Sequence, residues 1–169
     1  YLWKKMQEFY GFYGAHYTSV ELKREYARLC REEGKKFKGK EDFEITIENV
    51  FEGLFTNKGI EVSQDTIKVA CEFFRIISTK FVKLYDGVID LFEELKKKNK
   101  KIYLLSNAQE VFTAPELKYL GIWDYFDGIL ISSVKGCKKP SSDFFNALID
   151  RYKLDKSKSI MIGNDGTSD

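Results

Sequence analysis

Three apolar runs in the second half of the chain each end in polar or small residues, and these ends carry the side chains best suited to chemistry. The first run ends at Ser106 and Asn107. The third runs into Asp165, with Asp169 four positions later, and Lys139 lies between the second and third runs. A hydroxyl, an amide, an ammonium and two carboxylates form an inventory that suits phosphoryl transfer.

Each of these groups has a known use in phosphate chemistry. Hard oxygen ligands such as Asp165 and Asp169 suit Mg²⁺, which takes one or two carboxylates together with water and substrate phosphate. A hydroxyl and a backbone amide where a strand turns into a helix can donate to phosphoryl oxygens, as Ser106 is placed to do. A lysine offsets the charge that develops on a transferred group. Taken singly, these residues also fit duller roles: a helix cap, a solvated surface lysine or a glycine turn. Their order and spacing within one α/β pattern favour a phosphate-binding site.

The segment around Lys139 has a predictable local shape. Pro140 restricts Lys139 to an extended conformation, and Ser141 can cap the helix that follows. This arrangement would hold the ammonium over the same edge as the strand ends.

The elements that must position these residues alternate along the chain. Apolar runs over 101–107, 128–133 and 159–165 alternate with helical patterns over 88–95, 115–120 and 144–152. Such alternation predicts a doubly wound parallel sheet, a Rossmann-like α/β architecture. Ligands of such sheets lie beyond the carboxyl ends of the strands, so we expect the three polar ends to meet.

The first part of the chain has a helical pattern and no chemical motif. Ser19 and Ser63 are candidate N-caps, and residues 57–59 form a turn signal. We therefore predict a helical domain over 1–82 and an α/β domain over 83–169. Three apolar stripes define the helices of the helical domain: Leu22, Tyr26, Leu29 and Cys30; then Phe43, Ile47, Val50, Phe51 and Leu54; then Ile67, Ala70, Cys71, Phe74, Ile77 and Phe81.

Composition excludes several classes of protein. A net charge of +2 is too small to indicate a nucleic-acid partner, and no apolar run is long enough for a membrane span. Three widely spaced cysteines, Cys30, Cys71 and Cys137, argue against a disulfide framework and for a reducing, cytoplasmic setting. With His16 as the one histidine, a zinc site is not expected.

The α/β part resembles the haloacid dehalogenase-like hydrolase superfamily, whose members are mostly Mg²⁺-dependent phosphatases. The resemblance runs through "YDGVIDLFEELKKKNKKIYLLSNAQ", "LGIWDYFDGILISSVKGCKKPSSDFF" and "IMIGNDGTSD". It implies a phosphate-binding hydroxyl at Ser106, a charge-neutralising Lys139 and a metal pair at Asp165 and Asp169. Residues 1–82 would be the helical cap inserted in such enzymes. Asn164 stands where many relatives have the first acid, which leaves open which carboxylate binds the metal directly.

The resemblance also implies a nucleophile that these 169 residues lack. The family's attacking aspartate lies in an Asp-x-Asp stretch on a first strand upstream of the cap, and no such stretch is present. Because the sequence starts at Tyr1, we expect the protein to extend beyond both ends, with a strand between those ending at Ser106 and Ile162. The fragment alone should be inactive. The implied reaction is hydrolysis of a small phosphomonoester through an aspartyl-phosphate.

Other activities fit the same residues. A metal-independent 2-haloacid dehalogenase shares the fold, although its relatives usually replace the fourth-motif acids by serine and asparagine. A non-catalytic binding or regulatory member is a second alternative. A nucleotide phosphatase is a third, in which aromatic residues near the start would stack on a base. These are Tyr1, Trp3, Phe9, Tyr10, Phe12, Tyr13 and Tyr17. The sequence predicts neither the substrate nor the oligomeric state.

Overall fold

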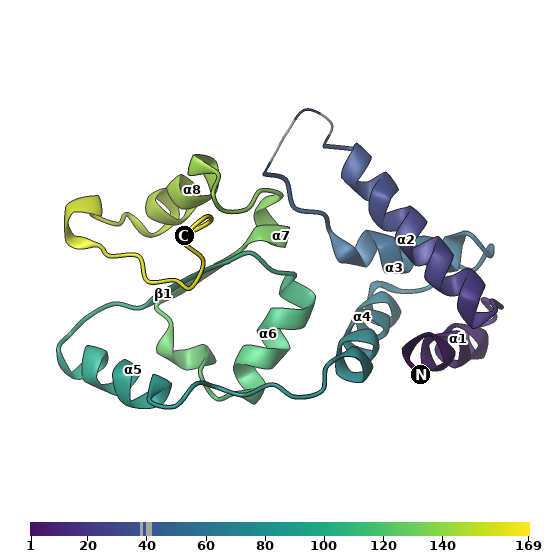
Figure 1. The fold of residues 1–169 in the computed structure, drawn as a ribbon, viewed down its shortest axis with the longest axis horizontal. Coiled ribbons are helices and arrows are strands. Elements are labelled where there is room, and N and C mark those ends of the chain that lie inside the picture. Colours follow the sequence, from purple (N-terminus) through teal and green to yellow (C-terminus); the bar gives the residue numbers. More distant parts are fainter. Residues whose placement is uncertain (38, 40–41) are drawn as a thin grey trace. The chain divides into compact units, whose positions relative to one another are not determined.

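The chain forms two compact units. The computed structural model describes residues 1–37, 39 and 42–169. Tyr1–Gly39 and Ile45–Val82 form a helical unit, and Lys40–Glu44 joins Lys83–Asp169 in an α/β unit (Figure 1). The described residues 42–44 therefore group with the α/β unit although they lie within the first 82 residues.

The helical unit contains four helices. They are α1 (Leu2–Phe12), α2 (Ser19–Lys35), α3 (Ile47–Thr56) and α4 (Gln64–Ser78). The sequence patterns predicted the last three, whereas α1 was not singled out among the aromatic residues near the start. Among the described residues, no helix is both long and apolar enough to cross a bilayer.

Local capping explains where these helices begin. Ser63 caps α4 by accepting a hydrogen bond from the Thr66 amide at 3.2 Å, as predicted. The cap of α2 is Thr18 rather than Ser19, because the Thr18 hydroxyl accepts from the Glu21 amide and the Glu21 carboxylate accepts from the Thr18 amide. The α3 helix ends at Thr56, at the predicted turn.

The core of the helical unit consists of the apolar stripes facing one another. The buried residues include Met6, Tyr10, Leu22, Val50, Phe51, Leu54, Phe55, Ile67, Ala70 and Cys71. Two predicted stripe members lie elsewhere. Phe43 precedes α3 and forms an isolated bridge with Cys137 in the α/β unit, and Phe81 follows α4 with 79% of its surface exposed. The predicted stripes therefore extend beyond the helices, because Phe43 precedes the start of α3 and Phe81 follows the end of α4.

The α/β unit alternates helices and strands. Its elements are α5 (Val88–Lys97), β1 (Tyr103–Ser106), α6 (Glu110–Tyr119), η1 (Trp123–Tyr125), β2 (Gly128–Ile131), α7 (Ser132–Lys135), α8 (Ser142–Tyr152) and η2 (Lys156–Lys158). The α6 helix begins five residues before the predicted Pro115 and includes that proline. Ser141 caps α8 as predicted, because its hydroxyl accepts from the Asp143 amide.

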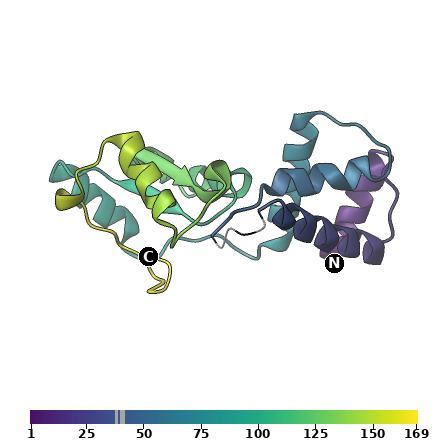
Figure 2. The same ribbon diagram turned by 90° about the horizontal axis from the view of Figure 1, so that it is seen from above.

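A small parallel sheet lies at the centre of this unit. Strands β1 and β2 pair in register from Tyr103 opposite Gly128 to Ser106 opposite Ile131. One face is covered by α8, since Phe144 packs against Leu105 and Leu130 (Figure 2). Two of the three predicted strands are therefore present, and their parallel pairing through a helix follows the expected pattern.

The third predicted strand is absent. Residues 159–163 contain no assigned strand, and Ile160, Met161 and Ile162 are 85%, 44% and 76% exposed. An apolar run becomes a strand only where a neighbouring strand pairs with its backbone groups. Among the described residues no strand lies beside 159–163, so the described part of the parallel sheet has two strands.

Tyr152 fixes the edge of β2. Its hydroxyl accepts a hydrogen bond from the Ile129 amide at 3.1 Å and lies 3.2 Å from the Ile129 carbonyl, to which it can donate. The Tyr152 ring crosses Gly128 so closely that a Cβ there would lie 2.3 Å from Tyr152 Cζ. Glycine at 128 is thus required by the side chain that covers this edge.

Candidate functional site

Ser106 is the last residue of β1, where the chain leaves the sheet. It lies opposite Ile131 and is partly buried. No hydrogen bond of the Ser106 hydroxyl is formed within the part of the chain that the structure describes. The hydroxyl can therefore act as donor to an incoming oxygen without breaking an existing contact.

Asn107 joins the end of β1 to the backbone of Lys139. Asn107 Nδ2 donates to the Lys139 carbonyl at 3.0 Å, and the Lys139 amide donates to Asn107 Oδ1 at 2.8 Å. Both ends of the amide side chain are thus used within the protein. Because Asn107 directly follows Ser106, its side chain holds the backbone of Lys139 close to the end of β1.

Lys139 and Asp169 form an ion pair. The Lys139 ammonium contacts Asp169 Oδ1, and the two side chains keep 11% and 10% of their exposure. The hydrogen bond from Lys139 lowers the pKa of the Asp169 carboxyl below its usual range. A fixed ammonium and an ionised carboxylate therefore lie at the end of the sheet that carries Ser106.

Asp165 organises the final turn of the chain. Its Oδ1 accepts from the Thr167 hydroxyl at 2.7 Å and the Thr167 amide at 3.0 Å, and its Oδ2 accepts from the Ser168 hydroxyl at 2.8 Å. These donors, those of Thr167 first, lower the pKa of Asp165 to about 2. The Asp165 amide donates to Asp169 Oδ2 at 2.9 Å, which links the two acids.

Four of the five predicted site residues are therefore connected by direct contacts. Asn107 holds Lys139, Lys139 pairs with Asp169, and Asp169 is bonded to Asp165. Ser106 is covalently next to Asn107, with no contact of its own hydroxyl to the rest.

The acids offer two oxygen ligands of the kind that Mg²⁺ prefers. Within the described residues, no group of three or more His, Cys, Asp or Glu side chains has the arrangement of a metal site. Two carboxylates still fit Mg²⁺, because this ion commonly retains water and binds substrate oxygens. In the present arrangement both carboxylates are engaged by the protein, Asp169 by Lys139 and Asp165 by Thr167 and Ser168.

Two residues outside the predicted set support this site. Ser132, at the end of β2, has no exposed surface, and its hydroxyl lies 2.9 Å from Glu44 Oε2. Glu44 also accepts from Gln109 Nε2 at 3.0 Å. The polar end of the second run pointed to Ser132, but no pattern pointed to Glu44, which is 88 residues away.

The aromatic residues near the start mostly serve the helical core. Phe9 has ring contacts with Tyr13, Phe55 and Phe73, and Trp3 has ring contacts with Tyr26 and Phe74. The Tyr10 hydroxyl donates to the Phe51 carbonyl at 3.0 Å. These contacts support packing rather than base stacking as their role; Tyr1 and Phe12 are exposed.

The helical unit contains a cavity of about 450 Å³ between α2 and α3. Three carboxylates, Glu32, Glu33 and Glu52, line it with Lys36 and Asn49. Glu33 is satisfied inside it, because its Oε1 accepts from Asn49 Nδ2 at 2.7 Å and Lys36 pairs with its Oε2. None of the predicted site residues lines this cavity.

A family model and a solved structure both match most of the chain. The family model described as "Hydrolase: haloacid dehalogenase-like hydrolase" matches residues 6–169. A HAD family enzyme from Bacteroides thetaiotaomicron, in a solved structure, has a TM-score of 0.50 and 22% identity, over 80% of this chain and 67% of that one.

Two curated relatives match shorter stretches. Ribulose-1,5-bisphosphate 5-phosphatase of Halopiger xanaduensis is 31% identical over 77 residues, which is 46% of this chain and 32% of the relative. Pyrimidine 5'-nucleotidase YjjG of Escherichia coli K12 is 31% identical over 84 residues, 49% of this chain and 37% of the relative. The alignments thus span about a third of each relative's length.

Proposed function

The chain belongs to the haloacid dehalogenase-like hydrolase family, and on that premise we propose that it is part of a Mg²⁺-dependent phosphomonoester hydrolase. Its substrate would be a small phosphorylated metabolite. The observation that carries this proposal is the linked set Asn107, Lys139, Asp169 and Asp165 at the end of β1, beside the hydroxyl of Ser106. The three widely spaced cysteines, Cys30, Cys71 and Cys137, suit a cytoplasmic setting.

Each residue has a defined part in the reaction. The Ser106 hydroxyl donates to a phosphoryl oxygen, and the Lys139 ammonium offsets the negative charge of the phosphoryl group as it is transferred. Asp165 and Asp169 would hold Mg²⁺. When bound, the ion supplies positive charge that stabilises the phosphoryl oxygens.

The nucleophile would come from an Asp-x-Asp segment that these 169 residues do not contain. A carboxylate oxygen of its first aspartate forms a bond to phosphorus while the ester oxygen leaves with a proton from the second aspartate. Water then hydrolyses the aspartyl-phosphate and releases inorganic phosphate. The coding sequence upstream of Tyr1 tests this point, because an open reading frame without Asp-x-Asp would rule the route out.

Turnover of phosphorylated compounds by the longest product of the gene tests the proposal as a whole. The names of the relatives put sugar bisphosphates and nucleoside monophosphates first in the panel. We expect phosphate release that stops with a chelator, returns with Mg²⁺ and is lost in the Asp165→Asn/Asp169→Asn double variant. Chloride release from a 2-haloacid that is unaffected by chelation would favour the dehalogenase instead. A folded protein that binds phosphate without turnover would indicate a non-catalytic member.

A further inference from the structure

A short segment between α2 and α3 pairs with the residues just before Lys139. We call residues 42–44 the strap. The Lys138 amide donates to the Asp42 carbonyl at 3.0 Å, and the Glu44 amide donates to the Gly136 carbonyl at 3.2 Å. Phe43 forms an antiparallel bridge with Cys137 between these two bonds. The strap therefore lies antiparallel to 136–138 and ends on Glu44.

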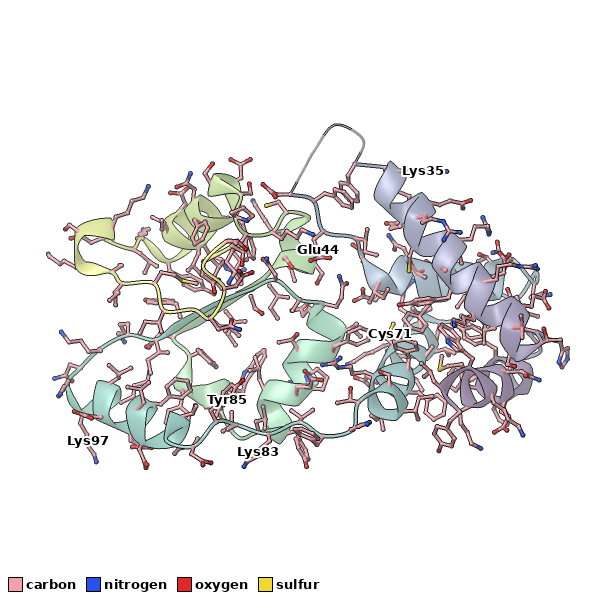
Figure 3. The ribbon with its side chains drawn as sticks, in the orientation of Figure 1. Lys35, Glu44, Cys71, Lys83, Tyr85 and Lys97 are labelled. Carbon is pink, nitrogen blue, oxygen red and sulfur yellow. The ribbon has the colours of Figure 1, made fainter. Side chains whose placement is uncertain are left out.

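The Glu44 carboxylate then joins two further elements. Figure 3 labels Glu44 beside the green helix α7. Oε1 accepts from Gln109 Nε2 at 3.0 Å, at the start of α6. Oε2 accepts from Ser132 Oγ at 2.9 Å, at the start of α7. One carboxylate thus contacts the segments that follow β1 and β2.

Ser132 carries this contact to the loop after β1. Its hydroxyl has no exposed surface and accepts from the Ala108 amide at 2.8 Å. The same hydroxyl lies 3.0 Å from the Ala108 carbonyl, which the Ser133 amide also contacts at 3.2 Å. Since the Ser132 hydroxyl has a single proton, the Glu44 carboxylate and the Ala108 carbonyl compete for it.

Ala108 follows Asn107, whose side chain holds the backbone of Lys139. The contacts therefore close a ring: strap to 136–138, Lys139 to Asn107, Ala108 to Ser132, and Ser132 back to Glu44. Two segments that carry predicted site residues, the loop after β1 and the segment 136–139, are therefore joined twice: directly through Asn107, and through the strap and Ser132.

We propose that Glu44 is a positioning residue, which fixes the loop after β1 and the Lys139 segment relative to each other. The effect on turnover rests on the proposed phosphatase function, whereas the effect on loop order does not. Its action is through hydrogen bonds rather than through charge at the reacting group, because the contacts of its carboxylate described above go to Gln109 and Ser132. Loss of the contact with Ser132 would free the loop at Ala108 from the strap and, through Asn107, loosen the backbone of Lys139.

Amide hydrogen exchange tests the inference without requiring activity. In Glu44→Ala we expect the Ala108 and Lys139 amides to exchange roughly 10-fold faster, the effect of about one net hydrogen bond, because Ser132, whose hydroxyl accepts from the Ala108 amide, is no longer held by Glu44. Glu44→Gln should restore protection, because its carbonyl can accept from Gln109 and its amide can donate to Ser132. Asp42→Ala is the matched control, since it alters the strap but leaves its backbone bonds, and should exchange like wild type.

Turnover supplies the second readout. If the longest gene product is a phosphatase, Glu44→Ala should lower kcat roughly 10- to 100-fold, the range for slight misplacement of catalytic groups, with Glu44→Gln near wild type. Unchanged exchange at Ala108 and Lys139 in Glu44→Ala would overturn the inference, as would a Glu44→Gln variant as defective as Glu44→Ala. Faster exchange in a protein that releases no phosphate would retain the inference and reject the phosphatase.

Ser132→Ala provides a second route if Glu44→Ala does not fold. The substitution is nearly isosteric and removes the link between Glu44 and Ala108. It should accelerate exchange at Ala108 about as much as Glu44→Ala, and the double variant should add little. Independent, additive effects would overturn the proposed ring.

Discussion

The ammonium of Lys139 and the carboxylate of Asp169 lie in direct contact although 30 residues separate them in the chain. Each side chain keeps about a tenth of its exposure, 11% for Lys139 and 10% for Asp169. The contact joins the segment held by Asn107 to the last residue of the sequence. It is the connection on which the proposed site depends.

Replacing Lys139 should impair turnover much more than folding. In the longest gene product, Lys139→Ala should reduce kcat about 100-fold, because a charge that stabilises the transferred group is removed. Lys139→Arg should retain part of the rate. Lys138→Ala, a neighbouring lysine, is the control. A Lys139→Ala enzyme with the wild-type rate would remove Lys139 from the site.

Asp165 should remain ionised to unusually low pH. Hydrogen bonds from Thr167 and then Ser168 lower its pKa to about 2, against roughly 3.9 for a free aspartate. The folded-state pKa is depressed, so the stabilisation is present above about pH 4 and is lost as the pH falls towards 2. Carboxyl carbon chemical shifts followed by NMR would give the titration directly.

The double variant Thr167→Val/Ser168→Ala provides the comparison for that titration. Without the two hydroxyls, the pKa of Asp165 should rise towards the value of a free aspartate. Thr113→Val, a hydroxyl outside the loop, should leave it unchanged. An Asp165 pKa near 4 in the wild-type protein would contradict the hydrogen bonding described for the final turn.

Gly128 should tolerate no larger residue. A Cβ at this position would lie 2.3 Å from Tyr152 Cζ and 2.5 Å from Cε1, so Gly128→Ala must displace the ring. We expect a loss of about 1–3 kcal/mol in the free energy of unfolding, typical of overpacking, measured by urea denaturation. Gly166→Ala, where a Cβ meets no atom within 4 Å, should change stability little. Equal stabilities for the two variants would refute the close approach.

Asp127 should stabilise the fold, because it directly precedes β2 and its carboxylate binds the amide of Ile102, which directly precedes β1. Its carboxylate accepts from Lys96 Nζ at 2.7 Å, Lys101 Nζ at 3.0 Å and the Ile102 amide at 2.9 Å. Burial alone would raise the pKa of Asp127, but these hydrogen bonds together hold it well below its usual range. The stabilisation is therefore complete above about pH 4 and declines in acid.

The free energy of unfolding of the Asp127→Asn variant should be lower than that of wild type by about 1.5–3 kcal/mol at pH 7, the range for hydrogen bonds to a charged group. The difference from wild type should shrink as the pH falls below 4. Asp124→Asn, a change of the same charge three residues earlier, is the control. A pH-independent difference would show that packing rather than ionisation accounts for the effect.

The parts of the fold that depend on neighbouring residues could be predicted from the sequence. Ser63 and Ser141 cap helices as expected, because a cap uses amides two or three positions away. The α2 cap was misplaced by one residue, since Thr18 and Ser19 both carry a hydroxyl. Strands were harder to predict: β1 and β2 pair with each other, whereas 159–163 has the same apolar character but no strand beside it among the described residues.

The site shows the same division. Ser106, Asn107, Lys139, Asp165 and Asp169 were predicted from their places at the ends of the apolar runs or between them, and Asn107, Lys139, Asp169 and Asp165 are linked by direct contacts. Glu44 was not identified. It lies between two helices, 88 residues before Ser132, and only the folded chain places the two together.

The Tyr152 hydroxyl bonds both the amide and the carbonyl of Ile129, and this limits where a further strand can join the sheet. A strand arriving at β2 would find that position already bonded and the ring of Tyr152 across Gly128. Addition there would first require α8 to release its last residue. Any further strand, from this polypeptide or another, therefore has to join on the side of β1, next to the serine that ends it.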